Sequence, residues 1–119
     1  MPKKILIIDD EPEFLKLLKK RLEFELYVVL TAENGEKGFE LALNERPDLI
    51  ILDVCMPFLN GLTFVYAAKH MKEIKEIPIL IITASQTRDL FKGSKIVNFM
   101  RKPYDKDELI RNINFCLSK

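Results

Sequence analysis

Aspartates directly follow two of the most apolar stretches of the chain. Asp9 and Asp10 come after the run Ile5–Ile8, and Asp53 comes after the run Leu49–Leu52. Gathering carboxylates inside a folded protein costs free energy unless something cationic binds there. Carboxylate oxygens are ligands for hard cations such as Mg²⁺, and a carboxylate can also act as a nucleophile. The pattern therefore indicates chemistry rather than packing.

A hydroxyl group and an amine follow two later apolar runs in the same way. Thr83 follows the run Ile79–Ile82, and Lys102 follows the short run Phe99–Met100. If these runs are parallel strands, their carboxyl ends lie along one edge of the sheet, where open α/β sheets bind their ligands. We therefore expect the aspartates, the threonine and the lysine to share one small space at that edge.

Apolar runs alternate with helical patterns along the whole chain. In the first helical pattern, Phe14, Leu17, Leu18 and Leu22 form an apolar stripe at helical spacing. The strands are expected at about residues 4–8, 27–31, 49–52, 79–82 and 97–100. The helices are expected at about 12–24, up to about 45, around 62–71 and at about 106–117.

Five strands alternating with helices predict an α/β fold, a single doubly wound, five-stranded parallel sheet with helices on both faces. The natural strand order is the flavodoxin-like 2-1-3-4-5. Strands one and three are then neighbours, so Asp9, Asp10 and Asp53 are expected to converge. The interval 84–95 between the fourth and fifth strands is short, so the fourth helix is predicted to be short or irregular, at about 86–92.

Composition narrows the class of protein. The length of 119 residues fits one domain, residues 1–119, and the 19 basic and 18 acidic side chains give no support for direct nucleic-acid binding. No apolar run approaches the roughly 20 residues of a membrane helix, and the start of the chain does not resemble a signal peptide. We therefore expect a cytoplasmic protein that does not bind membranes.

The two cysteines, Cys55 and Cys116, do not form a metal-binding or redox motif. In the last helix Leu109, Ile113 and either Cys116 or Leu117 are expected to face inward. That helix runs away from the edge where Cys55 lies, which puts Cys116 roughly 15 Å from it. A disulfide tolerates only about 7 Å between Cα atoms. No intramolecular disulfide is therefore expected.

With these features, the chain resembles the receiver domain of bacterial two-component response regulators, including the chemotaxis regulators. The likeness covers nearly all 119 residues. Each motif is weak alone, but five in the family's order on a matching alternation are specific. The motifs are Asp9-Asp10-Glu11-Pro12, Asp53 with Met56-Pro57, Asn60-Gly61, Thr83, and Lys102-Pro103.

The resemblance implies that Asp53 is the phosphoacceptor. It would take a phosphoryl group from a histidine kinase or phosphotransfer protein, and so switch binding to a downstream protein target or effector domain. Mg²⁺ would neutralise charge along the in-line path of transfer. By the resemblance, its ligands are Asp9, Asp10, Asp53 and the backbone carbonyl of Cys55. Such a domain catalyses its own phosphoryl transfer and dephosphorylation and is not a conventional enzyme.

The resemblance also implies roles for three residues near the acceptor. The Lys102 ammonium would pair with phosphoryl oxygens as a point charge, and the Thr83 hydroxyl would hydrogen-bond another oxygen. Phe99 matches the family's aromatic switch position, although it lacks the hydroxyl of a tyrosine. By the resemblance, Cys55 and Ser85 occupy positions that tune dephosphorylation in this family.

Each of these residues also has a structural interpretation. Asp10 or Glu11 could cap the first helix, Thr83 could end a strand, Lys102 could be a solvated lysine, and Phe99 could be a core residue. A phosphatase of the haloacid dehalogenase type would need an acid at position 55, and a cofactor binder would need a glycine-rich loop. The remaining alternative is a receiver-like interaction module that acts without phosphorylation.

Overall fold

The computed structural model describes residues 2–53, 58–83, 97–101 and 104–118. All five strands join in one parallel sheet of order β2-β1-β3-β4-β5, which confirms the predicted topology. The strands are β1 (Lys4–Ile8), β2 (Val28–Ala32), β3 (Leu49–Asp53), β4 (Ile79–Thr83) and β5 (Val97–Arg101).

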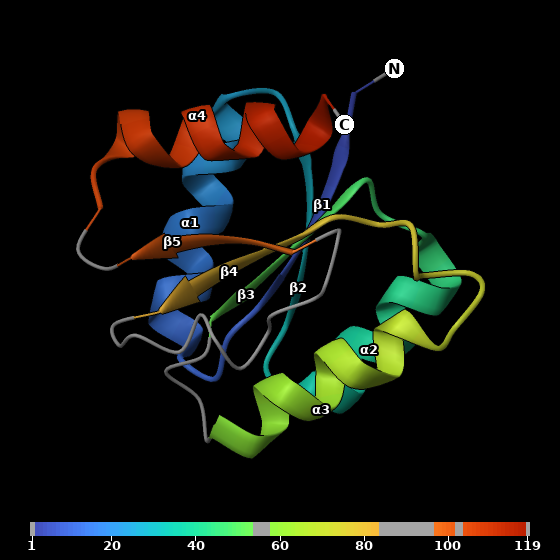
Figure 1. Cartoon of the computed structure of the whole chain (residues 1–119). Coiled ribbons are helices and arrows are strands. Elements are labelled where there is room, and N and C mark those ends of the chain that lie inside the picture. Colours follow the sequence, from blue (N-terminus) through green and yellow to red (C-terminus); the bar gives the residue numbers. More distant parts are fainter. Residues whose placement is uncertain (1, 54–57, 84–96, 102–103, 119) are drawn as a thin grey trace.

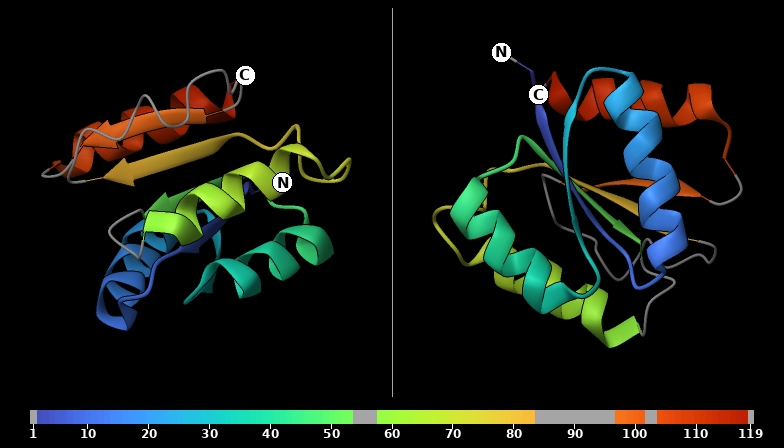
Figure 2. Two further views of the ribbon diagram at one scale, coloured as in Figure 1. Left: turned by 60° about the horizontal axis from the view of Figure 1, so that its bottom comes forward. Right: turned by 180° about the vertical axis from the view of Figure 1, so that it is seen from behind.

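Helices cover both faces of the sheet, as a doubly wound fold requires. The helices are α1 (Pro12–Phe24), α2 (Gly35–Glu45), α3 (Phe58–Lys69) and α4 (Lys106–Leu117). Figure 1 and Figure 2 show α1 and α4 on one face and α2 and α3 on the other. The expected short helix at about 86–92 lies outside the described residues. Within the described part, no helix is long and apolar enough to cross a membrane.

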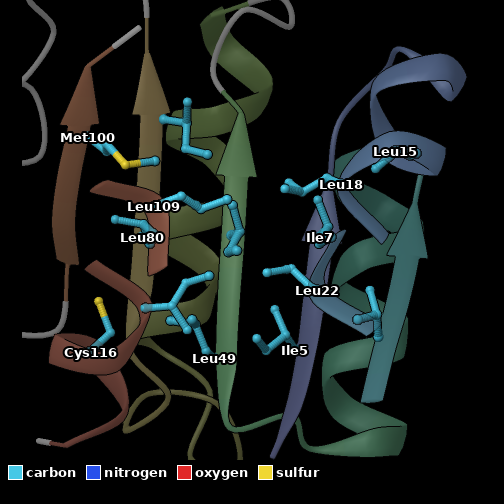
Figure 3. Packing of buried hydrophobic residues seen from close by; sticks show 14 residues of the cluster. Ile5, Ile7, Leu15, Leu18, Leu22, Leu49, Leu80, Met100, Leu109 and Cys116 are labelled. Atoms are coloured by element: carbon cyan, nitrogen blue, oxygen red, sulfur yellow. The ribbon is translucent and has the colours of Figure 1, made fainter. Parts of the chain in front are cut away.

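The core between the sheet and the pair α1 and α4 is built from alternate strand residues (Figure 3). Because successive side chains of a strand point to opposite faces, every second residue of a central strand faces these helices. Leu109, Ile113 and Cys116 of α4 are buried here, which confirms the inward positions expected for the last helix. The strand contribution comprises Ile5, Ile7, Val29, Leu49, Ile51, Leu80, Ile82 and Met100.

The opposite face of the sheet packs against α2 and α3. Phe39 of α2 meets Phe64 of α3 edge to face, with ring centroids 6.1 Å apart. The strand residues buried on this face are Leu6, Ile8, Ala32, Ile50, Leu52, Ile79 and Ile81. Every residue of β3 is buried, because this strand lies at the centre of the sheet between two helical layers.

The apolar stripe of α1 differs from the predicted one at two positions, because Leu15 lies inward and Leu17 lies outward. Leu15, Leu18 and Leu22 face the sheet, whereas Leu17 is 60% exposed. Phe14 is only partly buried against the same core. The inward residues Leu15, Leu18 and Leu22 have the spacing i, i+3 and i+7. Leu17 does not fit this spacing, and it lies on the solvent side of the helix.

Gly38 of α2 lies directly against the core side chain of Ile8. A Cβ atom added at Gly38 would be 2.4 Å from Cδ1 and 2.7 Å from Cγ1 of Ile8, which is fully buried. Gly38→Ala should therefore lower the free energy of unfolding by about 1–3 kcal/mol, despite alanine's higher helix propensity. Urea denaturation would measure this. Glu40→Ala, on the exposed side of the same helix, should change it by less than about 0.5 kcal/mol. An equal or higher stability for Gly38→Ala would contradict the close contact.

The end of α1 is a Schellman motif with a leucine at the position usually taken by glycine. The N–H of Tyr27 donates to Leu22 O at 3.1 Å, and the N–H of Leu26 donates to Glu23 O at 2.9 Å. Because Tyr27 belongs to this motif, β2 begins at Val28 and not at Tyr27 as predicted. Leu26 adopts φ 72° and is 81% exposed, so its side chain contributes little burial.

Leu26→Gly should raise the free energy of unfolding by about 0.5–1 kcal/mol. A left-handed conformation costs an L-residue about 1–2 kcal/mol, of which glycine's larger entropy loss on folding offsets a part. Thermal and urea denaturation would measure the gain. Arg46, which ends α2 at φ 46°, offers a parallel case, and Arg46→Gly should also stabilise. A less stable Leu26→Gly variant would show that the leucine makes a favourable contact.

Tyr27, which directly precedes β2, contacts α4 through its hydroxyl, which donates to Oδ1 of Asn114 at 3.1 Å. Partial burial, with a smaller contribution from the Glu25 carboxylate, raises the pKa of the Tyr27 phenol above its usual value of about 10. The folded state therefore holds this proton more tightly than the unfolded state. This contribution to stability is present below about pH 10 and is lost as the pH rises through the raised value.

Tyr27→Phe should therefore make the loss of stability above about pH 10 smaller than in the wild type. Urea midpoints measured at about pH 8 and about pH 11 would give the two declines. Tyr66→Phe is the matched control, because Tyr66 is exposed on α3. A decline unchanged by Tyr27→Phe would show that this phenol does not contribute to it.

Candidate functional site

The pairing of β1 with β3 brings two aspartates to the same edge of the sheet. Ile8 is the partner of Leu52 in the parallel register, so Asp9 and Asp53 are the next residues on the two neighbouring strands. Both are buried, with 1% of Asp9 and 2% of Asp53 exposed. The alternation that puts Leu49 and Ile51 on the α1 and α4 face also puts Asp53 on that face.

Asp9 is held in place by two backbone hydrogen bonds. Its N–H donates to Ala32 O at 3.1 Å, and its Oδ1 accepts the N–H of Glu11 at 3.0 Å. Glu11 occupies the N-cap position of α1, but its side chain makes no capping hydrogen bond, and Pro12 begins the helix. The capping role considered for Glu11 is therefore not observed. Sequence reasoning could not find the role of Ala32, because it depends on the register of β2.

Asp10 differs from the two buried aspartates. It directly follows Asp9 in the chain but is exposed to solvent. In the described part of the chain, no group of three histidine, cysteine or acidic side chains is gathered closely enough to hold a metal ion. The structure thus provides two buried carboxylates at the ends of neighbouring strands, with a third, that of Asp10, next to Asp9 in sequence.

The ends of β4 and β5 lie along the same edge as Asp53. In the register of the sheet Asp53 is the partner of Ile82, and Thr83 is the partner of Arg101. The backbone of Thr83 therefore ends its strand one position beyond Asp53, and Arg101 ends β5 at the same level. Cys55 and Lys102 lie outside the described residues.

Phe99 of β5 packs against the core between the sheet and the helices α2 and α3, and it is partly buried. This contact agrees with the interpretation of Phe99 as a core residue. Its role as an aromatic switch stays a prediction.

Two buried carboxylates at one edge favour a cation, because each negative charge disfavours the other in a poorly solvated place. Hard oxygen ligands of this kind suit Mg²⁺, which is often held by one or two carboxylates with water completing its shell. Asp9 and Asp53 therefore fit such an ion by number, charge and chemistry. A buried carboxylate at a strand end can also serve as a nucleophile toward phosphorus if the charge of the incoming group is neutralised.

The model of the response regulator receiver domain matches residues 5–114 of this chain. The chain belongs to this family. Receiver domains are the phosphoacceptor domains of two-component response regulators. This chain, called the receiver below, is therefore a signalling domain. They interact with histidine kinases and with downstream effectors.

Known proteins support this identification along the whole receiver. Protein PilH of Pseudomonas aeruginosa is 36% identical over 118 residues, covering 97% of this chain and 98% of PilH. The receiver also matches DNA-binding and transcriptional regulators, but it spans only about half of their length.

Solved structures share the fold. Chemotaxis protein CheY4 of Vibrio cholerae superposes with a TM-score of 0.89 at 28% identity, covering 98% of this chain and 100% of CheY4. A sensor histidine kinase receiver domain from Pseudomonas aeruginosa has a TM-score of 0.88 at 21% identity, with full coverage of both chains. That structure was solved with magnesium coordinated in its active site cleft.

Proposed function

We propose that Asp53 is the residue that accepts the phosphoryl group. The observation that carries this proposal is its position, buried at the end of the central strand β3 and level with Asp9, which directly follows the neighbouring strand β1. One carboxylate oxygen would attack phosphorus while the donor's leaving group departs, giving an acyl phosphate. The proposed domain comprises residues 1–119, and its donor is a histidine kinase or phosphotransfer protein.

Asp9 and Asp53 are the residues proposed to bind Mg²⁺. Their carboxylate oxygens match the ligand preference of the ion, and the wider ligand set suggested by the family likeness adds Asp10 and the backbone carbonyl of Cys55. When bound, Mg²⁺ would offset the negative charge that otherwise opposes the approach of a phosphoryl group. The hydrogen bond from Glu11 N–H to Asp9 Oδ1 keeps this carboxylate oriented.

Lys102 and Thr83 are proposed to contact the phosphoryl oxygens. The strands that lead to them end at the same edge as Asp53, because Thr83 and Arg101 are partners in the register of β4 and β5. A cationic ammonium and a neutral hydroxyl would each stabilise negative charge on those oxygens. Phosphorylation would then change the binding of a downstream protein.

Exposure to a small phosphodonor with Mg²⁺ tests this function directly. Intact mass should show the addition of one phosphoryl group, and the adduct should be labile in base, as acyl phosphates are. Omission of Mg²⁺ should slow the uptake strongly. A wild-type protein that takes up nothing at any Mg²⁺ concentration, yet binds its partner, would favour the interaction module that acts without phosphorylation.

A further inference from the structure

A second feature lies at the end of the outer strand β2, beside the edge of the sheet that carries Asp9 and Asp53, here called the acid edge. A cavity of about 340 Å³ opens there between α1, the end of β2 with the residue that follows it, and α2. Figure 2 shows β2 running between α1 and α2 in the view from behind. The volume falls within the range of about 300–1,000 Å³ that is typical of small-molecule sites.

Three lysines line this cavity. Lys16 and Lys19 come from α1, and Lys37 comes from the first turn of α2. Among the described ion pairs, Lys4 and Lys106 each have a carboxylate partner, but these three lysines make none. One acidic residue, Glu33, also lines the cavity, so its four charged side chains carry a net charge of +2.

The remaining walls combine an apolar surface with a hydroxyl group. Pro12 and Leu15 lie on the same face of α1 as the lysines, at the spacing i, i+3, i+4 and i+7. Ala32 is the third apolar residue of the wall, and Thr31 can donate a hydrogen bond. A ligand that suits these walls has a compact anionic group and an apolar body.

We propose that this cavity binds a phosphomonoester dianion that carries an apolar or aromatic body. A phosphoryl group holds about −1.5 to −2 charge at neutral pH, which matches the net charge of the cavity. Lysine ammonium groups bind such groups as point charges. The site is separate from the acceptor at Asp53, and the proposal does not depend on phosphorylation of the receiver.

A ligand in this cavity would affect the position of Asp9 at the acid edge, because two residues that line the cavity are connected to Asp9 by short paths. Ala32, which lines the cavity, accepts the N–H of Asp9 at 3.1 Å. Pro12, on the opposite wall, follows Glu11, whose N–H binds the Asp9 carboxylate at 3.0 Å. A bound phosphomonoester therefore touches both segments that fix Asp9.

Titration of phenyl phosphate into isotope-labelled protein tests the proposal. The experiment is done in EDTA, so that a metal at Asp53 cannot hold the probe. We expect saturable shifts at the amides of Thr31, Glu33 and Lys37, and weaker binding as salt rises. Inorganic phosphate lacks the aromatic body and phenol lacks the phosphoryl group, so each should bind less tightly than phenyl phosphate. Adenosine monophosphate and a short phosphotyrosine peptide then distinguish a free small molecule from a protein-borne phosphate.

Matched variants distinguish binding inside the cavity from nonspecific attraction of the probe to the positive charge of the protein. The double variant Lys16→Gln with Lys37→Gln should weaken phenyl phosphate by about tenfold. Lys20→Gln with Lys69→Gln removes the same charge from exposed positions outside the cavity and should have little effect. Asp53→Asn should bind the probe like the wild type. Absent saturation, an equal loss in both double variants, or loss in Asp53→Asn would overturn the proposal.

Discussion

Asp53→Asn should lose phosphoryl uptake from a small phosphodonor by about a hundredfold or more. The amide is neutral and lacks the carboxylate oxygen that attacks phosphorus, while its size and shape are almost unchanged. The side chain is buried at the end of β3, so no neighbouring surface group can replace it. Intact mass after a timed incubation with Mg²⁺ measures the effect.

Two comparisons make the Asp53→Asn result specific. Asp107→Asn changes an exposed aspartate in the first turn of α4 and should be labelled at the wild-type rate. The melting temperature of Asp53→Asn without metal should equal or exceed that of the wild type, because one of two buried charges at the edge is removed. Labelling of Asp53→Asn at the wild-type rate would refute the assignment.

Leu18→Ala should lower the free energy of unfolding by about 2–5 kcal/mol. Leu18 is 3% exposed and packs between α1 and the sheet, so truncation removes buried methyl groups and leaves a cavity (Figure 3). Leu17 is its neighbour on the same helix and is 60% exposed. Leu17→Ala should change the stability by less than about 0.5 kcal/mol.

The pair Leu17 and Leu18 is a sharp test because both substitutions change the same residue type in one helix. Urea denaturation with a common slope would give both values. Similar losses for the two variants would show that α1 is rotated relative to the described packing, and that the stripe predicted from the sequence was correct.

The topology could be predicted from the sequence because each strand carries its own signal. The runs Ile5–Ile8 and Leu49–Leu52 are apolar on both faces, which is typical of central strands in a parallel sheet. Their central place explains why the following residues, Asp9 and Asp53, are buried. The alternation with helices then restricts the strand order to a few choices.

Finer details depended on contacts that a linear pattern does not contain. Leu15 and Leu17 are equally apolar, and only the rotation of α1 against the sheet decides which is buried. Tyr27 has the residue type of a strand, but the Schellman motif at the end of α1 takes its N–H. The lysine cavity joins residues from two helices on opposite faces, so no local spacing revealed it.

The position of β1 and β3 at the centre of the sheet has a kinetic consequence. Ile5 pairs with Leu49, and the hydrogen bond from Lys4 N to Asp48 Oδ2 joins residues separated by 44 positions. Contacts between residues far apart in the chain form slowly, because the entropy of loop closure is lost before the contact stabilises anything. During synthesis, Asp9 leaves the ribosome long before the strand that carries Asp53. The aspartate pair therefore cannot assemble in a nascent chain until β3 has been synthesised and has paired with β1.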